Sequence, residues 1–353
     1  MIDWTASMKQ TFEFYVVDPG TWGDAEQLDI ITSGSIIRDE GNDSLGSASF
    51  TATEMIDECY IRVYLVAIQN GEKYRFPLGT YLCQTPGSKF DGRVTEISIQ
   101  AYTPLIELKE KCPPIGYAVA RNRPIVEVAG KLTSENLRAP VVESSGSAKL
   151  LDPFVANLND TWLTFITDLL ANADYHLDLD ELGQVLFAPY YDLASMQPFW
   201  TFDDGNSSIL QPSVSLDRDL YNMPNVVEVI YSNENRSMYA RVVNNDPDSP
   251  ISTVNRGREI VYRETDPDLY EGITQGQLNA YAKKVLRSKS SLEYTITYTH
   301  GYCPVRIGDC VTLNYQNAGL NNVKARVTRQ SIRLEPGCQV DETAVYSTNL
   351  WGG

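Results

Sequence analysis

Histidine is scarce in this 353-residue sequence, which contains only His176 and His300. Any Ser–His or Cys–His catalytic pair must therefore use one of these two imidazoles. The sequence also lacks a Gly-x-Ser-x-Gly nucleophile elbow. Neither of the glycine-rich phosphate-binding patterns, Gly-x-x-x-x-Gly-Lys-Ser/Thr and Gly-x-Gly-x-x-Gly, is present. These absences argue against the common classes of hydrolase and nucleotide-binding enzyme.

The six cysteines form no Cys-x-x-Cys pair, and their spacing matches no zinc-binding pattern. A chain of this length does not need disulfides to fold, so we expect reduced and mostly buried thiols, although the even count leaves disulfides open. Residues 1–20 lack the cationic start and apolar run of a signal peptide. No stretch approaches about 18 uninterrupted apolar residues, so we expect no spanning helix and no membrane anchor.

Positive charge is also in short supply, with 29 Lys and Arg against 46 Asp and Glu and a formal net charge of −17. An acidic surface repels the phosphates of nucleic acids and of anionic membranes. The same repulsion suits a wall past which DNA slides without sticking. Hydrophobic residues make up 42% of the chain, which is enough to bury a core.

Residues 1–112 are predicted to form a small antiparallel β-barrel-like domain. Apolar and polar residues alternate along several segments, as expected of half-buried strands: 11–17, 59–68 and 94–101. Tight turns are expected at Asn70-Gly71 and Asp91-Gly92, because these residue types tolerate positive φ.

Residues 113–200 are predicted to form an α+β insert, which begins at the paired prolines Pro113 and Pro114. Helices are expected near 124–137 and 160–172, where apolar residues recur at helical spacing. Asn159 or Asp160 is the expected cap of the second helix. A β-hairpin is expected over 175–190, with its turn at Gly183.

Residues 201–353 are predicted to form a second β-barrel-like domain that carries one helix over 274–288. Thr274 and Gln277 have the spacing of a capping box at the start of that helix. The expected fold class is thus α+β, mostly β: two small antiparallel β-barrel-like domains with a helix-containing α+β insert between them.

The nearest approach to a metal site is the run Asp174, His176, Asp178 and Asp180. Spacing by two places these four on one face of a strand, and carboxylates with an imidazole can hold a cation. The simpler interpretation, which we favour, is the solvent face of a half-buried strand, since the central glycine and distal glutamate of a calcium loop are missing.

Three pairs of residues are possible catalytic groups: two pairs of carboxylates and one His–Cys pair. Asp203-Asp204 before Gly205, and Asp217 with Asp219, are carboxylate pairs of the kind that glycosidases use. Such pairs are frequent in an acidic chain, and Asp-Gly is an ordinary turn signal. His300 and Cys303 are too close in sequence to resemble a usual dyad. We therefore predict no catalytic, cofactor-binding or metal-binding residues and no enzymatic activity.

Basic residues are concentrated in two stretches near the C-terminal end: Lys283, Lys284, Arg287, Lys289, Lys324, Arg326, Arg329 and Arg333. This concentration is more typical of a solvated face, or of contact with an acidic face of a neighbouring copy, than of a nucleic-acid site. Self-association of so acidic a chain requires complementary patches of this kind to offset the repulsion.

The order and spacing of several segments resemble the tail hub proteins of tailed phages, including the baseplate hub, the late control protein D group and the hub region of siphophage tail-associated proteins. The segments that carry the resemblance are Thr161–Tyr175, Gly183–Tyr190, Tyr221–Val227, Val305–Val311 and Ala325–Gly337. The resemblance spans nearly the whole chain.

This resemblance implies a homotrimeric virion protein at the tail tip or baseplate, whose paired barrels form a ring around the DNA exit channel. It implies contacts with the tail tube or distal tail protein, the tape measure and a tip or fibre protein, and no cofactor. The long C-terminal extension of many siphophage relatives has no counterpart before Gly353. Two alternatives stay open: a tail-associated cell-wall or glycan hydrolase using Asp203/Asp204 or Asp217/Asp219, and a carbohydrate-binding adhesin using the many tyrosines and tryptophans.

Overall fold

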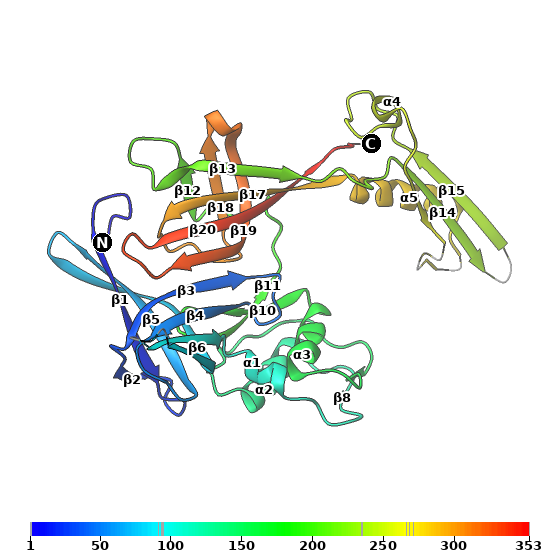
Figure 1. Cartoon of the computed structure of the whole chain (residues 1–353). Coiled ribbons are helices and arrows are strands. Elements are labelled where there is room, and N and C mark those ends of the chain that lie inside the picture. The colour runs from blue at the N-terminus through cyan, green and yellow to red at the C-terminus, as the bar shows by residue number, and fades with distance from the viewer. Residues whose placement is uncertain are drawn as a thin grey trace. The chain divides into compact units, whose positions relative to one another are not determined.

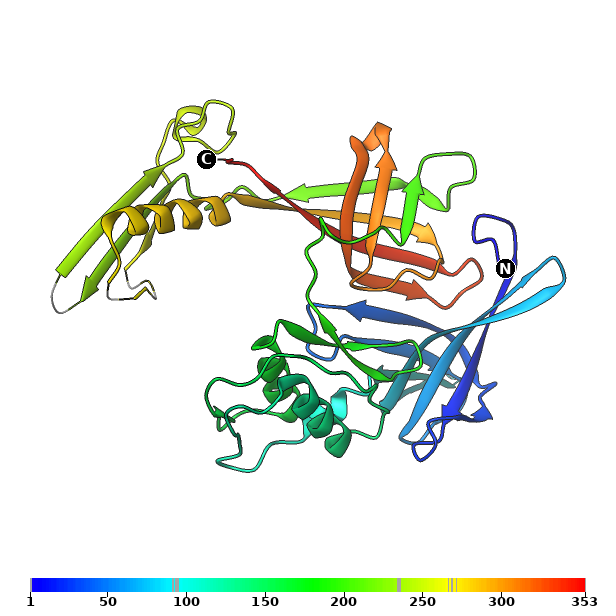
Figure 2. The same ribbon diagram turned by 180° about the vertical axis from the view of Figure 1, so that it is seen from behind.

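The fold was described from a computed structural model, which covers residues 2–90, 92, 95–233, 236–265, 267, 269–270 and 272–352. Strands dominate, and five α-helices are interspersed among them (Figures 1 and 2). The predicted class, mostly β with some helix, is confirmed. Closed barrels are not confirmed, because the largest sheet of the described residues runs in open order through thirteen strands.

The N-terminal strands follow the predicted alternation. Their bounds are β1 (Lys9–Val17), β2 (Asp24–Gln27), β3 (Ile31–Asp39), β4 (Gly46–Ala52), β5 (Cys59–Gln69), β6 (Glu72–Phe90) and β7 (Thr95–Tyr102). The turn between β5 and β6 has Asn70 at φ 53° and Gly71 at φ 84°, as a primed hairpin turn requires. The second expected turn involves Asp91, which lies outside the described residues.

The insert contains the two predicted helices and the predicted hairpin. A short helix, α1 (Ile106–Glu110), precedes the insert within the region 1–112. The elements of the insert are β8 (Ala118–Val119), α2 (Ile125–Asn136), β9 (Phe154–Val155), α3 (Trp162–Ala171), β10 (Tyr175–Leu179) and β11 (Val185–Pro189). The apolar stripe of α3 is fully buried against α2, and Leu177 and Phe187 join that core. The cap of α3 was predicted wrongly, because Thr161 forms a capping box with Thr164 and thereby satisfies the first backbone amides.

The C-terminal strands join the N-terminal ones directly. They are β12 (Trp200–Asp203), β13 (Leu210–Arg218), β17 (Ser291–Gly301), β18 (Cys310–Tyr315), β19 (Leu320–Arg333) and β20 (Gln339–Asn349), with a 3-10 turn at Gln316–Ala318. β19 pairs antiparallel with β3, from Arg329 opposite Asp39 to Arg333 opposite Ser35. Strands from the two ends of the chain therefore share one hydrogen-bonded sheet.

The chain divides into two compact units, one of Met1–Val214 with Thr297–Ala344 and the other of Ser215–Ile296 with Val345–Gly353. The second unit holds a three-stranded sheet in the order β15-β14-β16, covered on one face by a helix. Its elements are β14 (Val226–Asn233), β15 (Arg236–Val243), α4 (Thr253–Arg256), β16 (Val261–Glu264) and α5 (Gln275–Lys289). The predicted division at 1–112, 113–200 and 201–353 stays a prediction.

The capping box of α5 is confirmed, since the Thr274 hydroxyl accepts from the Gln277 amide and the Gln277 side chain accepts from the Thr274 amide. Leu278, Ala282 and Leu286 bury the apolar face of the helix against β14 and β15. Trp351, near the C-terminal end, completes this core.

Candidate functional site

The turn between β10 and β11 is held by a convergence of buried hydrogen bonds. The carbonyl of Leu182 accepts from Trp22 Nε1 at 2.8 Å, from Thr80 Oγ1 at 2.9 Å and from Arg62 Nη2 at 3.1 Å. The Arg62 side chain is 5% exposed and also pairs with Asp24 at 2.9 Å. These bonds fix the tip of the insert hairpin to the N-terminal strands.

Gly183 is needed for this close approach. Its φ is +76°, and a Cβ at this position would lie 2.8 Å from Cβ of Thr80. A side chain here would therefore meet both a steric contact and an unfavourable backbone conformation. Glycine is thus the residue that lets the hairpin tip reach the sheet.

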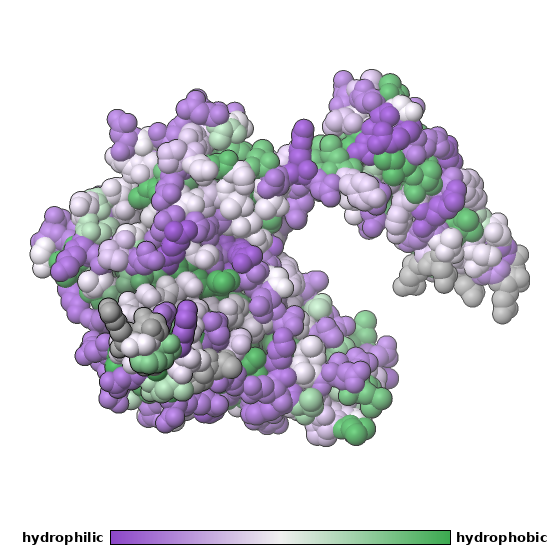
Figure 3. Space-filling model, in the orientation of Figure 1, coloured by the Kyte–Doolittle hydropathy of each residue, from purple (hydrophilic) through white to green (hydrophobic). Residues whose placement is uncertain are grey.

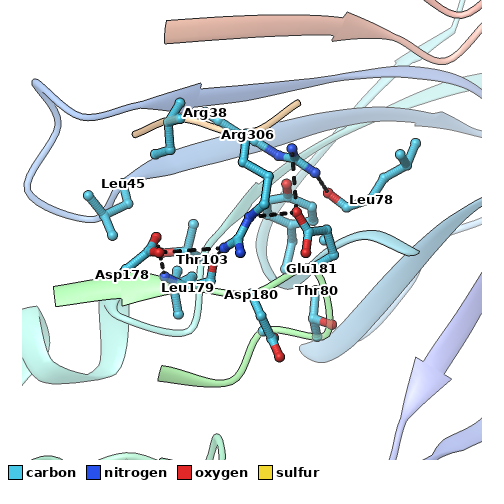
Figure 4. A pocket seen from close by; sticks show the side chains of 14 residues that line it. Arg38, Leu45, Leu78, Thr80, Thr103, Asp178, Leu179, Asp180, Glu181 and Arg306 are labelled. Carbon is cyan, nitrogen blue, oxygen red and sulfur yellow. Dashed lines mark hydrogen bonds and ion pairs between the residues drawn. The ribbon is translucent and has the colours of Figure 1, made fainter. Parts of the chain in front are cut away.

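Four charged residues hold the other side of the hairpin (Figure 4). Arg306 pairs with Glu181 at 2.8 Å and with Asp178 at 3.6 Å, and Arg38 lies 3.8 Å from Glu181. The crevice among them has a volume of about 40 Å³, which is enough for water. The charges of this crevice are matched within the protein, so it functions as a joint between the hairpin and the turn before β18.

A larger hollow of about 360 Å³ lies beside this crevice. His176 and Tyr190 line it with ring centroids 4.6 Å apart, and Arg326 pairs there with Glu40. Burial lowers the pKa of His176, and its buried Nδ1 has no hydrogen-bond partner. An imidazole in this state is neutral at physiological pH and is a weak candidate for acid–base chemistry.

The predicted run of alternate acids and histidine does not form a metal site. Asp180 accepts hydrogen bonds from the amides of Leu182 and Gln184 in its own turn, and Asp178 pairs with Arg306. Across the part of the chain that the structure describes, no group of three or more His, Cys, Asp or Glu is placed to hold a metal ion. His176, Asp178 and Asp180 are half-buried, so a simple solvent face does not describe this strand: Asp178 pairs with Arg306, and the ring of Tyr190 packs against His176.

The two carboxylate pairs lie at the surface, at the end of β12 and around the end of β13. All four residues are exposed: Asp203, Asp204, Asp217 and Asp219. Asp203 accepts from the Gly205 amide at 2.9 Å and Asp219 from the Tyr221 amide at 2.7 Å. These are the local side-chain-to-backbone bonds that aspartates make in turns. Neither pair shows the enclosed, facing arrangement of a glycosidase site.

His300 and Cys303 are brought together in the core, and a third residue joins them. Cys303 Sγ lies 3.9 Å from His300 Nδ1, and His300 Nε2 lies 3.3 Å from Glu342 Oε2. This order of Cys, His and Glu resembles a nucleophilic triad, but the three side chains are at most 1% exposed. Burial also raises the pKa of the Cys303 thiol, so it is neither accessible nor ionised.

The hydrogen bonds of this cluster fix the orientation of the His300 ring. His300 Nδ1 lies 2.7 Å from the Gly301 carbonyl, which only accepts, so Nδ1 is the donor in that bond. Glu342 also accepts from Tyr298 Oη and, at 2.6 Å, from Gln330 Nε2. The cluster is a satisfied polar core between β17, β19 and β20.

Sequence reasoning did not single out Glu342, although a signal was present. Cys338, Val340 and Ala344 are buried at alternate positions, and the same alternation places Glu342 on their face of the strand. A carboxylate on the apolar face of a strand requires a buried partner. The position of Glu342 on the buried face therefore predicts a buried polar cluster.

The basic residues belong to two separate groups. The four on β19 are occupied: Lys324 donates to the Met196 carbonyl, and the three arginines pair with acids. On α5, Lys289 lies 4.7 Å from the ring centre of Tyr262. Lys283, Lys284 and Arg287 are exposed along the same helix. Among these eight residues, free positive charge is therefore confined to α5, so the eight do not act as one nucleic-acid surface.

The structure contains no bridge between the six cysteines, and four of them are buried. In the described residues, no helix has the length and apolarity that a membrane span requires.

Comparison of the fold with solved structures gives consistent matches over nearly the whole chain. A tail protein from Neisseria meningitidis matches with a TM-score of 0.64 at 13% identity, covering 96% of each chain. The 43 kDa tail protein of prophage MuSo2 from Shewanella oneidensis matches with a TM-score of 0.62 at 12% identity, covering 95% of this chain and 98% of that one. Prophage tail protein gp18 from Listeria monocytogenes matches with a TM-score of 0.50 at 12% identity, covering 94% of each chain.

The fold is that of phage tail proteins. The resemblance read from the sequence is thereby confirmed at the level of the fold. No protein-family model and no curated protein matches the sequence.

Proposed function

We propose that the protein is a structural subunit of a phage tail, located at the tail tip or baseplate as a hub. The observation that carries this proposal is the shared fold with two tail proteins over at least 95% of this chain. In the proposed particle, copies of the chain form a homotrimeric ring that joins the tail tube to the tip and surrounds the DNA exit channel. Its neighbours are the tail tube or distal tail protein, the tape measure and a tip or fibre protein.

The internal contacts suit a part that transmits force. β3 and β19 join the two ends of the chain in one sheet, and Arg62 and Arg306 fix the insert hairpin to it from two sides. Buried, hydrogen-bonded networks of this kind resist local opening. A hub that holds the tail together needs this continuity more than it needs a reactive cleft.

The surface also suits assembly. Several apolar side chains of the insert are largely exposed: Ile115 at 91%, Leu151 at 89%, Leu158 at 86% and Val155 at 56%. Hydrophobic residues at the surface of the insert near β8 are visible in Figure 3. In the proposed particle a neighbouring tail protein covers these side chains, because removing apolar surface from water favours association. The net charge of −17 supports a channel wall that repels DNA.

Immunogold labelling of intact parent particles under the electron microscope tests this proposal. We expect gold at the distal end of the tail, with threefold density at that position in averaged images. Gold on the capsid or along the tail shaft, or no label on intact and gently disrupted particles, would refute the hub assignment.

The hydrolase and adhesin alternatives have their own tests. Release of soluble fragments from purified peptidoglycan, lost in Asp203→Asn or Asp217→Asn variants, would support hydrolysis. Binding of the isolated protein to whole host cells would support the adhesin. We expect neither result, and for hydrolysis the reason is that all four carboxylates are exposed at the surface.

A further inference from the structure

Cys59 and Cys83 lie directly opposite each other in the antiparallel pair β5–β6. Residues opposed in this way carry their side chains on the same face of the sheet, with Cα atoms about 4.5–5.5 Å apart. A disulfide needs a Cα separation of about 4.4–6.8 Å. The backbone of the folded protein therefore already places these two residues within bonding range.

The other four cysteines have no such partner. Cys310 is opposite Arg326 in the β18–β19 ladder. Cys112, Cys303 and Cys338 lie outside the strands that the structure describes. Cys59 and Cys83 are therefore the one cysteine pair aligned across the described ladders.

The surroundings give the two thiols different roles. Cys59 is the first residue of β5 and is partly exposed, whereas Cys83 is 2% exposed in the core of the sheet. Hydrogen bonding with the Cys83 thiol lowers the pKa of Cys59, and the same interaction together with burial raises the pKa of Cys83. Because the thiolate is the reactive form, Cys59 is the thiol that reacts first with an external reagent.

We propose that Cys59 and Cys83 form a disulfide in the folded protein when it meets a small disulfide oxidant such as oxidised glutathione. The Cys59 thiolate attacks one sulfur of the oxidant, which forms a mixed disulfide and releases one glutathione thiolate. That thiolate takes up the proton of the Cys83 thiol, and Cys83 then attacks the Cys59 sulfur and displaces the second glutathione. Two protein thiols are oxidised, and one glutathione disulfide is reduced to two glutathione molecules.

The bridge closes a loop of about 25 residues around the β5–β6 turn and restricts the unfolded chain. A protein assembled in a reducing cytosol and released into an oxidising medium would gain this link after release. The inference rests on the β5–β6 register and on the different exposure of the two thiols, and it is independent of the proposed hub function.

The test uses the full chain, first reduced and then equilibrated in buffers with increasing ratios of oxidised to reduced glutathione. Free thiols are alkylated, and the protein is digested with trypsin without reduction. Mass spectrometry should then find the peptide Asp39–Arg62 joined to Phe76–Lys89, each of which contains one cysteine of the pair. Alkylation of both cysteines at every ratio, or a link that forms only when urea is present, would overturn the proposal.

Single substitutions separate this bridge from general thiol oxidation. In Cys83→Ser, Cys59 should accumulate as a glutathione adduct without a link, and in Cys59→Ser the buried Cys83 should stay free. Cys112→Ser is the matched control, because Cys112 is exposed and unpaired, and it should keep the link. A stable glutathione adduct on Cys59 in the unsubstituted protein would show that Cys83 is out of reach.

Thermal unfolding supplies a second measurement. Oxidation should raise the midpoint of the unsubstituted protein and of Cys112→Ser by about 5 °C, as expected for a loop of this length. Oxidation should not raise the thermal midpoint of Cys59→Ser or of Cys83→Ser. A linked protein with an unchanged or lower midpoint would contradict an unstrained bridge in the folded sheet.

Discussion

The buried carboxylate of Glu342 provides the most demanding test of the core. It interacts with Tyr298 Oη, with Gln330 Nε2 at 2.6 Å and with His300 Nε2 at 3.3 Å, and its side chain is 0% exposed. We consider Glu342→Ala, which removes the acceptor shared by three buried groups and leaves each of them without that partner.

The expected loss follows from those three groups. A buried polar group left without its partner costs about 1–3 kcal/mol, and breaking a buried ion-pair-like contact from one side costs about 3–5 kcal/mol. Gln330 keeps its bond to the Val305 carbonyl at 2.9 Å and His300 keeps its bond to Gly301, which limits the total. We therefore expect Glu342→Ala to lower the free energy of unfolding by about 3–5 kcal/mol.

Asp341→Ala is the matched control, because Asp341 is the next residue on β20 and points to the other face. Its carboxylate accepts from Thr299 at 2.7 Å and pairs with Arg333 at 2.9 Å, where the two side chains are 35% and 48% exposed. Such a pair contributes about 1 kcal/mol or less. Tyr298→Phe removes one donor only and should cost about 1 kcal/mol.

Urea unfolding followed by circular dichroism measures these differences from the transition midpoints. The free energy of unfolding of Glu342→Ala should be well below that of Tyr298→Phe and that of Asp341→Ala. If Glu342→Ala unfolds within about 1 kcal/mol of Asp341→Ala, the carboxylate is not the centre of a buried network and the reasoning is refuted.

Three further predictions concern other parts of the chain. Gly183→Ala should lower the thermal midpoint more than Gly308→Ala. A Cβ at position 183 lies 2.8 Å from Thr80, whereas a Cβ at position 308 meets nothing within 4 Å. Equal shifts would contradict the close packing of the hairpin tip against Thr80. Thr274→Ala should cost about 1 kcal/mol in urea unfolding through loss of the α5 cap, with Thr274→Ser as the control that retains it. Burial holds the pKa of His176 in the folded protein below its unfolded value near 6.5, so its contribution to stability is complete above pH 6.5 and is lost as the pH falls. The unsubstituted protein should therefore lose more stability than His176→Phe between pH 7.5 and 5.5, and parallel curves would refute this assignment.

The sequence predicted the local structure wherever the sequence pattern spans only a few neighbouring residues. The stripe of α3, the capping box at Thr274 and the hairpin turn at Asn70-Gly71 all depend on residues within a few positions of one another. The cap of α3 was missed because three polar residues in a row compete for that position, and only Thr161 has the geometry to bond Thr164.

The site candidates were harder to judge from the sequence, because their surroundings come from distant segments. His300 and Cys303 are neighbours in sequence, but Glu342 completes the cluster from another strand and the core shuts all three away from solvent. Likewise, Asp178 looks like part of a solvent face until Arg306, which is distant in the sequence, pairs with it. Neither outcome follows from spacing along one strand.

The sequence alone therefore indicated the class of the protein: mostly β and acidic, with two helices before a β-hairpin and segments in an order that resembles phage tail proteins. Alternation, helical periodicity and turn chemistry act over a few residues, so they survive without tertiary information. Only the tertiary structure decided the rest: that β3 pairs with β19, that the hairpin tip bonds to Trp22, Arg62 and Thr80, and that Cys59 faces Cys83. These contacts depend on strand register and on pairing between distant segments. The hydrophobic pattern of a strand determines which face of the sheet is buried, but it does not select the partner strand.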